Sequence, residues 1–162
     1  MGLGFVTDVA VTAQRYKLFK DFSYIIGILH RTLDLHFHHL EMNIDNKIIS
    51  GENCFVEFCN SRYTGGNMLI APRAKIDDGL MDIVIAGPLS KQRLLAALPR
   101  IYTGTYTEMA EITYLQGKRV DIQATPSKAL LPDGEITGST PGKLEVLPGR
   151  LRYLSFESGA HC

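Results

Sequence analysis

Hydrophobic residues follow two different spacings along the chain. Between about residues 13 and 33 they recur at every third or fourth position, which predicts an amphipathic helix. A second helix is predicted to begin after an N-cap at Ser90 and to end at Gly104. Elsewhere apolar and polar residues alternate over short stretches, which is typical of strands. The expected strands cover residues 3–11, 33–44, 47–61 (as one or two strands), 68–72, 80–86, 111–115, 119–124, 127–131, 142–147 and 151–156.

The expected strand 33–44 changes the parity of its apolar positions. They are odd up to Phe37 and even from Leu40 onward, which predicts a bulge near His38 and His39. A turn is expected at 45–47, and the stretch after it is broken by glycine at 51. Two helices among many short strands favour a mainly β fold, an antiparallel β-sandwich with two or so appended α-helices.

Composition narrows the choice of partner and compartment. The 162 residues carry 17 Lys and Arg against 17 Asp and Glu, so net charge gives no reason to expect nucleic acid. A small basic cluster around Lys17 could face a phosphate, although a solvated helix face explains it more simply. Cys54 and Cys59 are expected on opposite faces of a strand as reduced thiols, which favours the cytosol. The apolar runs are too short to span a bilayer, so a lipid substrate would be met at the membrane surface.

Two acidic turns could carry chemistry. Asp77, Asp78 and Asp82 surround Gly79, and clustered carboxylates with a sharp backbone turn can hold a hard cation. Taken alone, this spacing favours a polar hairpin turn. The segment 133–135 (Asp-Gly-Glu) follows an apolar strand, where a rigid carboxylate can act as general base, although Asp-Gly is also a common turn signal.

Two further groups of residues are candidate sites. The glycine-rich loop 60–67 could approach a ligand closely but lacks the Gly-Lys-Ser/Thr of a phosphate loop, and a plain connection is the alternative. The histidines of segment 30–39 would need to converge to bind zinc, and exposed strand positions are favoured instead.

Taken in order, these segments resemble the C-terminal domain of the diacylglycerol kinase catalytic family, which includes sphingosine kinases and bacterial YegS-like lipid kinases. The resemblance covers about residues 4–154, and its most specific part is the block 70–85, Ile-Ala-Pro to Asp-Asp-Gly-Leu-Met-Asp-Ile-Val-Ile. The other matching segments are 4–9 with Tyr16 and Lys17, 60–66, 94–104 and 133–135.

The resemblance implies the fold, the site residues and the cofactors. Residues 1–162 would form the C-terminal domain of a NAD kinase/diacylglycerol kinase-like fold, and the N-terminal ATP-binding domain would be absent from the chain. Glu135 would be the base that accepts the proton of a lipid hydroxyl. Mg²⁺ would be held by the Asp78 carboxylate and the backbone carbonyls of Lys75 and Leu80, and Lys17 would contact the nucleotide.

The expected function is therefore ATP-dependent phosphorylation of a lipid hydroxyl, by a cytoplasmic enzyme in peripheral contact with the membrane. Sphingosine kinases carry an acid where this chain has Ala10, which favours a diacylglycerol-like acceptor over a sphingoid base. The chain alone is expected to be inactive and to need its N-terminal domain as partner, and a homodimer is left open. The alternative is a non-catalytic lipid-binding or structural β-sandwich.

Overall fold

The computed structural model describes residues 1–14, 23–65 and 67–152. Lys17 and residues 153–156 of the expected strand 151–156 lie outside these ranges. The elements, in chain order, are β1 (Gly2–Gly4), α1 (Phe5–Gln14), α2 (Ser23–Leu33), β2 (His38–Ile44), β3 (Lys47–Asn53), β4 (Phe55–Cys59), β5 (Met81–Ala86), α3 (Lys91–Thr103), η2 (Thr105–Glu108), β6 (Ile112–Gly117), β7 (Arg119–Thr125), η3 (Pro132–Gly134) and β8 (Gly142–Glu145).

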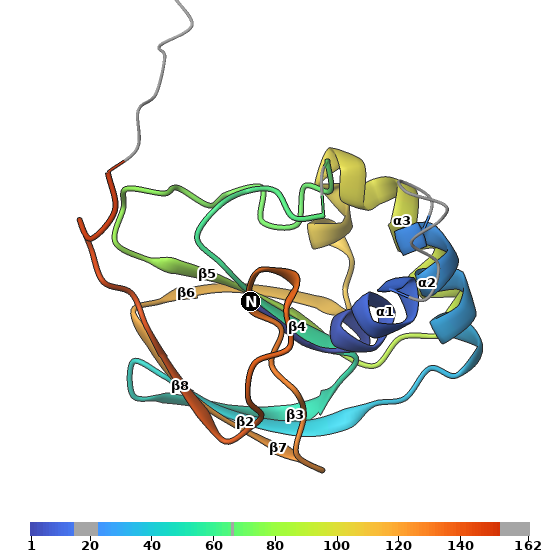
Figure 1. Ribbon diagram of the computed structural model, residues 1–162, viewed down its shortest axis with the longest axis horizontal. Coiled ribbons are helices and arrows are strands. Elements are labelled where there is room, and N and C mark those ends of the chain that lie inside the picture. Colours follow the sequence, from blue (N-terminus) through green and yellow to red (C-terminus); the bar gives the residue numbers. More distant parts are fainter. Residues whose placement is uncertain (15–22, 66, 153–162) are drawn as a thin grey trace, which may run out of the picture.

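The strands form two antiparallel sheets that face each other (Figure 1). The first sheet has the order β1-β4-β5-β6, and the second has the order β3-β2-β7-β8. The helices gather beside the first sheet and cover part of its outer face, as Figure 1 shows. This confirms the expected mainly β sandwich with appended helices.

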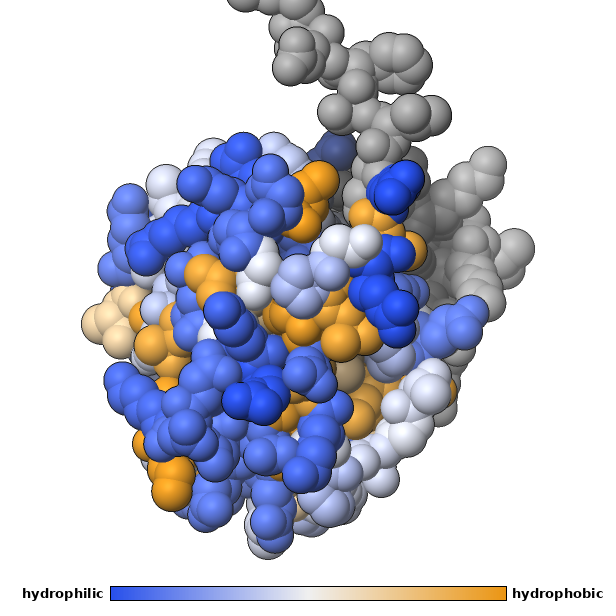
Figure 2. All heavy atoms as spheres, turned by 90° about the vertical axis from the view of Figure 1, so that its left-hand side faces the viewer, coloured by the Kyte–Doolittle hydropathy of each residue, from blue (hydrophilic) through white to orange (hydrophobic). Residues whose placement is uncertain are grey.

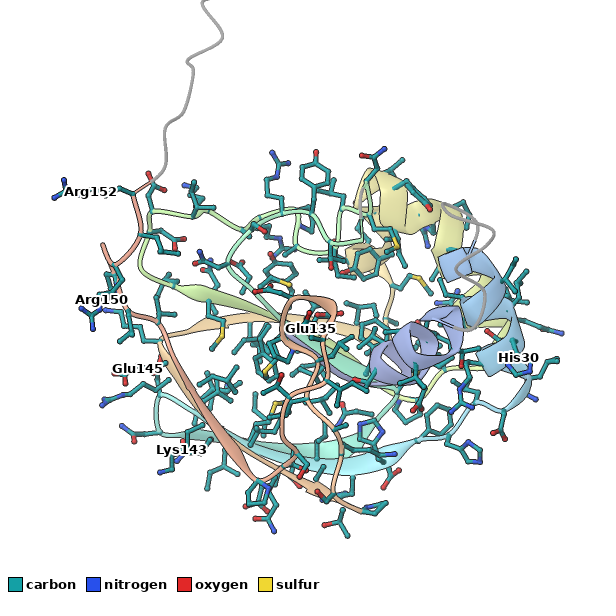
Figure 3. All side chains as sticks on the ribbon, viewed as in Figure 1. His30, Glu135, Lys143, Glu145, Arg150 and Arg152 are labelled. Carbon is teal, nitrogen blue, oxygen red and sulfur yellow. The ribbon has the colours of Figure 1, made fainter. Side chains whose placement is uncertain are left out.

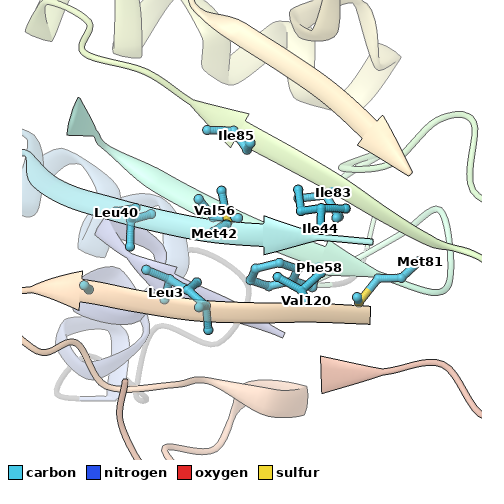
Figure 4. Packing of buried hydrophobic residues seen from close by; sticks show 12 residues of the cluster. Leu3, Leu40, Met42, Ile44, Val56, Phe58, Met81, Ile83, Ile85 and Val120 are labelled. Carbon is cyan, nitrogen blue, oxygen red and sulfur yellow. The ribbon is translucent and has the colours of Figure 1, made fainter. Parts of the chain in front are cut away.

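The main core lies between the two sheets (Figure 4). Alternate residues of β2 point inward, so Leu40 and Met42 are fully buried while Glu41 between them is exposed. Burial of an aliphatic side chain of this size contributes about 1.5–3 kcal/mol, which makes this layer the main source of stability. The buried members of the cluster are Leu3, Leu40, Met42, Ile44, Val56, Phe58, Met81, Ile83, Ile85, Val120, Ile122 and Ala124.

The prediction of a strand over residues 3–11 is wrong, because β1 ends after three residues and α1 follows directly. Gly4 has φ of +80°, a left-handed conformation that turns the chain out of the sheet. A Cβ atom at Gly4 would also lie 2.6 Å from the Cys54 carbonyl oxygen, so only glycine fits. Phe5 and Val9 then follow at helical spacing and are both buried. Of the expected helix 13–33, residues 13 and 14 end α1 and residues 23–33 form α2, and residues 15–22 lie outside the described ranges.

The bulge expected near His38 and His39 is also wrong. Strand β2 pairs with β3 in unbroken register from His38 to Ile44. The odd apolar positions belong to the end of α2 and the following loop, where Leu33 is 74% exposed and Phe37 is 41% exposed. Strand β3 runs through Gly51, and the break to β4 falls at Cys54.

Local turn and cap signals gave correct predictions. Asp45 and Asn46 have positive φ in the β2–β3 turn, Ser90 Oγ accepts a hydrogen bond from the Arg93 amide at 3.2 Å, and Gly104 caps α3 in the left-handed conformation. The expected strands 68–72 and 127–131 are replaced by isolated bridges. At the end of the sandwich seen in Figure 2, hydrophilic side chains surround a smaller area of hydrophobic ones. None of the described helices is long and apolar enough to cross a membrane.

Candidate functional site

A cleft of about 530 Å³ opens beside the edge of the first sheet, where β1 and β4 lie. It brings together segments that are far apart in the sequence: the loop after β4, one residue of the acidic loop 75–80, and the turn that contains Asp133. The lining residues are Met1, Glu57, Phe58, Cys59, Asn60, Ser61, Tyr63, Thr64, Ile70, Ile76 and Asp133. Three of the segments singled out in the sequence therefore border one cavity.

Backbone hydrogen bonds fix the Asp-Gly-Glu turn beside this cleft. The Gly2 amide donates to the Leu131 carbonyl at 3.0 Å, and the Leu131 amide donates back to Gly2 at 2.9 Å. The turn continues that extension of the sheet edge, and the Glu135 amide closes it by donating to the Pro132 carbonyl at 3.0 Å. Asp133 has φ of +46°, a left-handed conformation that Asp tolerates in turns.

Glu135 itself lies on the loop in front of this edge (Figure 3) and is exposed. Its backbone is extended, with φ of −112° and ψ of 138°. Asp133, two residues earlier, lines the cleft. Glu135 is not among the residues that line the cleft, so the structure brings Asp133 of this turn to the cleft and leaves the Glu135 side chain exposed two residues further along.

The acidic loop 75–80 offers oxygen donors for a cation. Asp78 Oδ1 accepts a hydrogen bond from the Leu80 amide at 2.9 Å, and Gly79 has φ of +69°. Lys75, Asp77 and Asp78 are exposed. No cluster of three His, Cys, Asp or Glu side chains occurs in the described ranges, so a cation here would depend on one carboxylate and backbone carbonyls. Such all-oxygen donors fit Mg²⁺ or Ca²⁺ in chemical type.

Asp82 does not belong to this loop, in contrast to the three-acid cluster expected from the sequence. Its side chain is fully buried on β5, where Oδ1 accepts hydrogen bonds from the Tyr114 hydroxyl at 2.7 Å and from Gln116 Nε2 at 3.2 Å. The Arg73 guanidinium lies 4.7 Å from the centre of the Tyr114 ring, and the Arg73 amide donates to the Tyr114 hydroxyl at 3.3 Å. This set joins β5, β6 and the loop between β4 and β5, so Asp82 braces the fold.

A buried acid on β4 was missed in the sequence. Glu57 is 8% exposed and stands opposite Gly2 of β1 in register. A Cβ atom at Gly2 would lie 2.8 Å from Glu57 Oε1, so the missing side chain leaves room for the carboxyl group. Burial raises the pKa of Glu57 to about 7. The available signal was a single charged residue inside the apolar run 54–59.

Glu57 also borders a second, apolar cavity of about 50 Å³ next to the helices. This cavity is lined by Phe5, Val6, Val9, Ile28, Phe55, Glu57, Thr64, Met68, Ile70, Leu94, Leu98 and Ile101. Glu57, Thr64 and Ile70 line both cavities. They therefore form a shared wall between an apolar compartment and the more polar cleft.

The remaining candidates lie apart from the cleft. His38 is buried, contrary to expectation, and burial lowers its pKa to about 4. His39 is exposed and contacts Ser50 Oγ at 2.9 Å. Asp8 forms an ion pair with Arg31 at 3.4 Å. No metal cluster of histidines is found in the part of the chain that the structure describes.

Comparison with known proteins agrees with this fold. Residues 1–155 match the family described as "YegS C-terminal NAD kinase beta sandwich-like domain". The chain therefore belongs to this family, whose relatives are named as lipid kinases.

Individual relatives support the assignment. A "Diacylglycerol kinase" of Mycobacterium tuberculosis (strain CDC 1551 / Oshkosh) is 33% identical over 98 residues, which cover 60% of this chain and 31% of that protein. A "Putative lipid kinase" of Staphylococcus aureus (strain JH9) is 25% identical over 158 residues, covering 96% of this chain and 52% of that protein. The chain thus spans about half or less of the length of these relatives.

Solved structures share the fold. A crystal structure titled as that of "a putative diacylglycerol kinase from Bacillus anthracis str. Sterne" superimposes with a TM-score of 0.63 at 23% identity. The match covers 78% of this chain and 45% of that one.

Proposed function

We propose that this chain is the acceptor-binding, C-terminal half of an ATP-dependent lipid kinase. The observation that carries the proposal is the meeting of three separate segments at one cleft: the loop 60–64, the acidic loop at Ile76 and the turn at Asp133. Phosphoryl transfer needs a positioned hydroxyl, a base and neutralisation of phosphate charge, and Glu135 and Asp78 lie on the two acidic segments whose Asp133 and Ile76 line the cleft.

Glu135 is the proposed base. Its exposed carboxyl group, two residues after Asp133 of the cleft, would accept the proton of the lipid hydroxyl as that oxygen attacks the terminal phosphorus of ATP. The nucleotide would be held mainly by an N-terminal domain of the same protein, with Lys17 as a contact from this chain. This domain arrangement accords with the longer relatives.

Mg²⁺ is the proposed metal at the acidic loop. The Asp78 carboxylate and the carbonyls of Lys75 and Leu80 would hold it, and the ion would supply positive charge beside the cleft. Because its ligands would all come from the protein, its main effect would be to fix the loop whose Ile76 lines the cleft.

The proposed acceptor is a neutral, diacylglycerol-like lipid rather than a sphingoid base. Ala10 offers no acid for an amino group, and it is buried. The apolar cavity adjoins the cleft and would take the first part of an acyl chain, although its 50 Å³ would have to widen for more. The protein would act in the cytoplasm in peripheral contact with the membrane.

A second candidate is a non-catalytic lipid-binding domain, which the apolar cavity favours independently of any acid. The two candidates differ in phosphate transfer. The longest natural protein that contains this chain, incubated with radiolabelled ATP, Mg²⁺ and detergent-dispersed diacylglycerol, should yield labelled phosphatidic acid. Sphinganine offered in the same assay should accept far less phosphate. Lipid binding without any transfer of label would select the non-catalytic candidate.

A further inference from the structure

The wall between the two cavities contains one buried acid. Glu57 is flanked on the outer face of β4 by Phe55 toward the helices and by Cys59 toward the loop side. It is the only buried acid among the residues that line either cavity. Within residues 1–14, 23–65 and 67–152, no hydrogen bond or ion pair to its carboxyl group is found; burial raises its pKa, and the charge of the Met1 amino group lowers it by a smaller amount.

An acid in this position has no structural explanation. Burying a carboxyl group without partners is unfavourable, whether the group is ionised or neutral. The strand positions on either side are filled by apolar residues, and an apolar residue at 57 would complete the same surface. The side chain is nevertheless accommodated, because Gly2 opposite it leaves the space that a Cβ atom would occupy.

The position of Glu57 relative to the proposed base suggests its role. Strand β1 lies between them: Gly2 pairs with Glu57 on one side and with Leu131, at the start of the Glu135 turn, on the other. Two strand spacings amount to roughly 10 Å between the backbones of Glu57 and Leu131, and the turn that carries Glu135 follows Leu131. Because Glu57 lies in the wall between the apolar cavity and the cleft, it would meet the part of an acceptor that joins the acyl chain to the reactive hydroxyl.

We propose that Glu57 is a specificity-determining residue that forms a hydrogen bond with a second donor group of the acceptor lipid, located between its acyl chain and the hydroxyl that is phosphorylated. This rests on the proposed lipid kinase function and refines the acceptor class. Among the neutral glycerolipids of the proposed function, this contact favours an acceptor with a free second hydroxyl, such as a monoacylglycerol, over a diacylglycerol, whose second hydroxyl is esterified and cannot donate. The pKa of Glu57, raised by burial to about 7, is consistent with an acid that a ligand hydroxyl can satisfy in either protonation state.

A matched pair of ligands tests this contact on the chain itself. 1-Octanoylglycerol has two free hydroxyls, and 1-octanoyl-2-O-methylglycerol has the second one capped. Calorimetric titration should show the diol binding about tenfold more tightly, the size of one hydrogen bond to a carboxyl group. Glu57→Leu should bind both ligands alike. Glu41→Leu, the same change at an exposed position of β2, should retain the tenfold preference.

Two outcomes would overturn the proposal. One is equal binding of both ligands by the unmodified chain, which needs no variant and so decides the matter even if Glu57→Leu fails to fold. The other is a folded Glu57→Leu that still prefers the diol. Phosphate transfer is measured separately: preference without transfer in the longer protein removes the kinase assignment only, and transfer without a Glu57-dependent preference removes this inference only.

Discussion

Two acids are buried on the same outer face of the first sheet, on neighbouring strands, and their surroundings differ. Asp82 on β5 accepts hydrogen bonds from Tyr114 and Gln116 at Oδ1, while its Oδ2 is buried without a partner among the described residues, and Asp82 borders neither of the two cavities. Glu57 on β4 borders both. A buried acid that is hydrogen-bonded can be explained by stability alone, whereas one that faces open space is better explained by a ligand. The Asp82 region is closed to both cavities, and the Glu57 region is open to them.

The largest effect is expected at the open region, where chemistry is proposed. Glu135→Gln keeps the size of the side chain but removes its ability to accept a proton. In the longer protein, turnover of lipid phosphorylation should fall about 10²- to 10⁴-fold. Thermal unfolding should be unchanged, because the side chain is exposed. Glu145→Gln, an exposed acid on β8, serves as control and should leave turnover unaltered (Figure 3). Turnover within a few fold of the unmodified enzyme would remove Glu135 from the base role.

The closed region should respond in stability rather than in activity. Asp82→Ala removes the acceptor of two hydrogen bonds and leaves the Tyr114 hydroxyl and Gln116 without it in a buried setting. The free energy of unfolding should fall by about 3 kcal/mol, measured by urea denaturation. Tyr114→Phe removes one of these bonds and should cost about 1 kcal/mol. A loss below that level for Asp82→Ala would mean that Asp82 does not brace the fold.

Glu57 should make the free energy of unfolding fall as pH rises. Its pKa is about 7 in the folded protein against 4.5 for an ordinary Glu, so the folded state binds more protons than the unfolded state between these values. The contribution of Glu57 to the free energy of unfolding is therefore fully present below pH 4.5. It declines as pH rises toward 7 and then levels off. Each pKa unit corresponds to about 1.4 kcal/mol, so the decline amounts to roughly 3 kcal/mol.

Glu57→Gln should remove that decline. The variant should match the unmodified chain near pH 4.5 and exceed its stability by up to roughly 3 kcal/mol at pH 8, measured by urea denaturation across the range. The neighbouring groups do not mimic the effect: burial raises the pKa of Cys59 to about 12 and raises that of Tyr106 as well, so both stay neutral. The Met1 amino group lowers the pKa of Glu57 and so acts against the decline. Parallel pH profiles would show that Glu57 does not titrate in this range.

Much of the fold was predictable from local signals in the sequence. Period-2 alternation identified the central strands, and the Asp45-Asn46 turn, the Ser90 cap and the Gly104 cap each gave a correct boundary. The N-terminal error had a tertiary cause: the segment after Gly4 is rich in Val and Phe, which favour strands, but its buried face packs against α2 and β4 as a helix. Propensity within ten residues cannot represent that packing.

The site was predictable only in part. Asn60–Thr64, Ile76 and Asp133 were reached through their motifs, and the structure places them at one cleft. Glu57 was missed because nothing in the sequence states that Gly2 lies opposite it or that cavities adjoin it on both sides. Asp82 was grouped with Asp78 because the two are close in sequence, yet the strand that begins at Met81 carries its side chain beneath the loop. In both cases, separation along the sequence was a poor guide to which residues are close in space.

The smallest effect concerns the cation at the rim of the open region. If Asp78 holds Mg²⁺, millimolar Mg²⁺ should raise the thermal midpoint of the chain by a few degrees through binding to the folded state alone. Asp78→Ala should abolish the rise, whereas Asp77→Ala, its exposed neighbour without the contact to the Leu80 amide, should preserve it. A rise that survives in Asp78→Ala, or is absent from the unmodified chain, would leave the loop as a turn held by its own hydrogen bond. Glu57 and Glu135 would then be the acids left to carry ligand recognition and chemistry at the cleft.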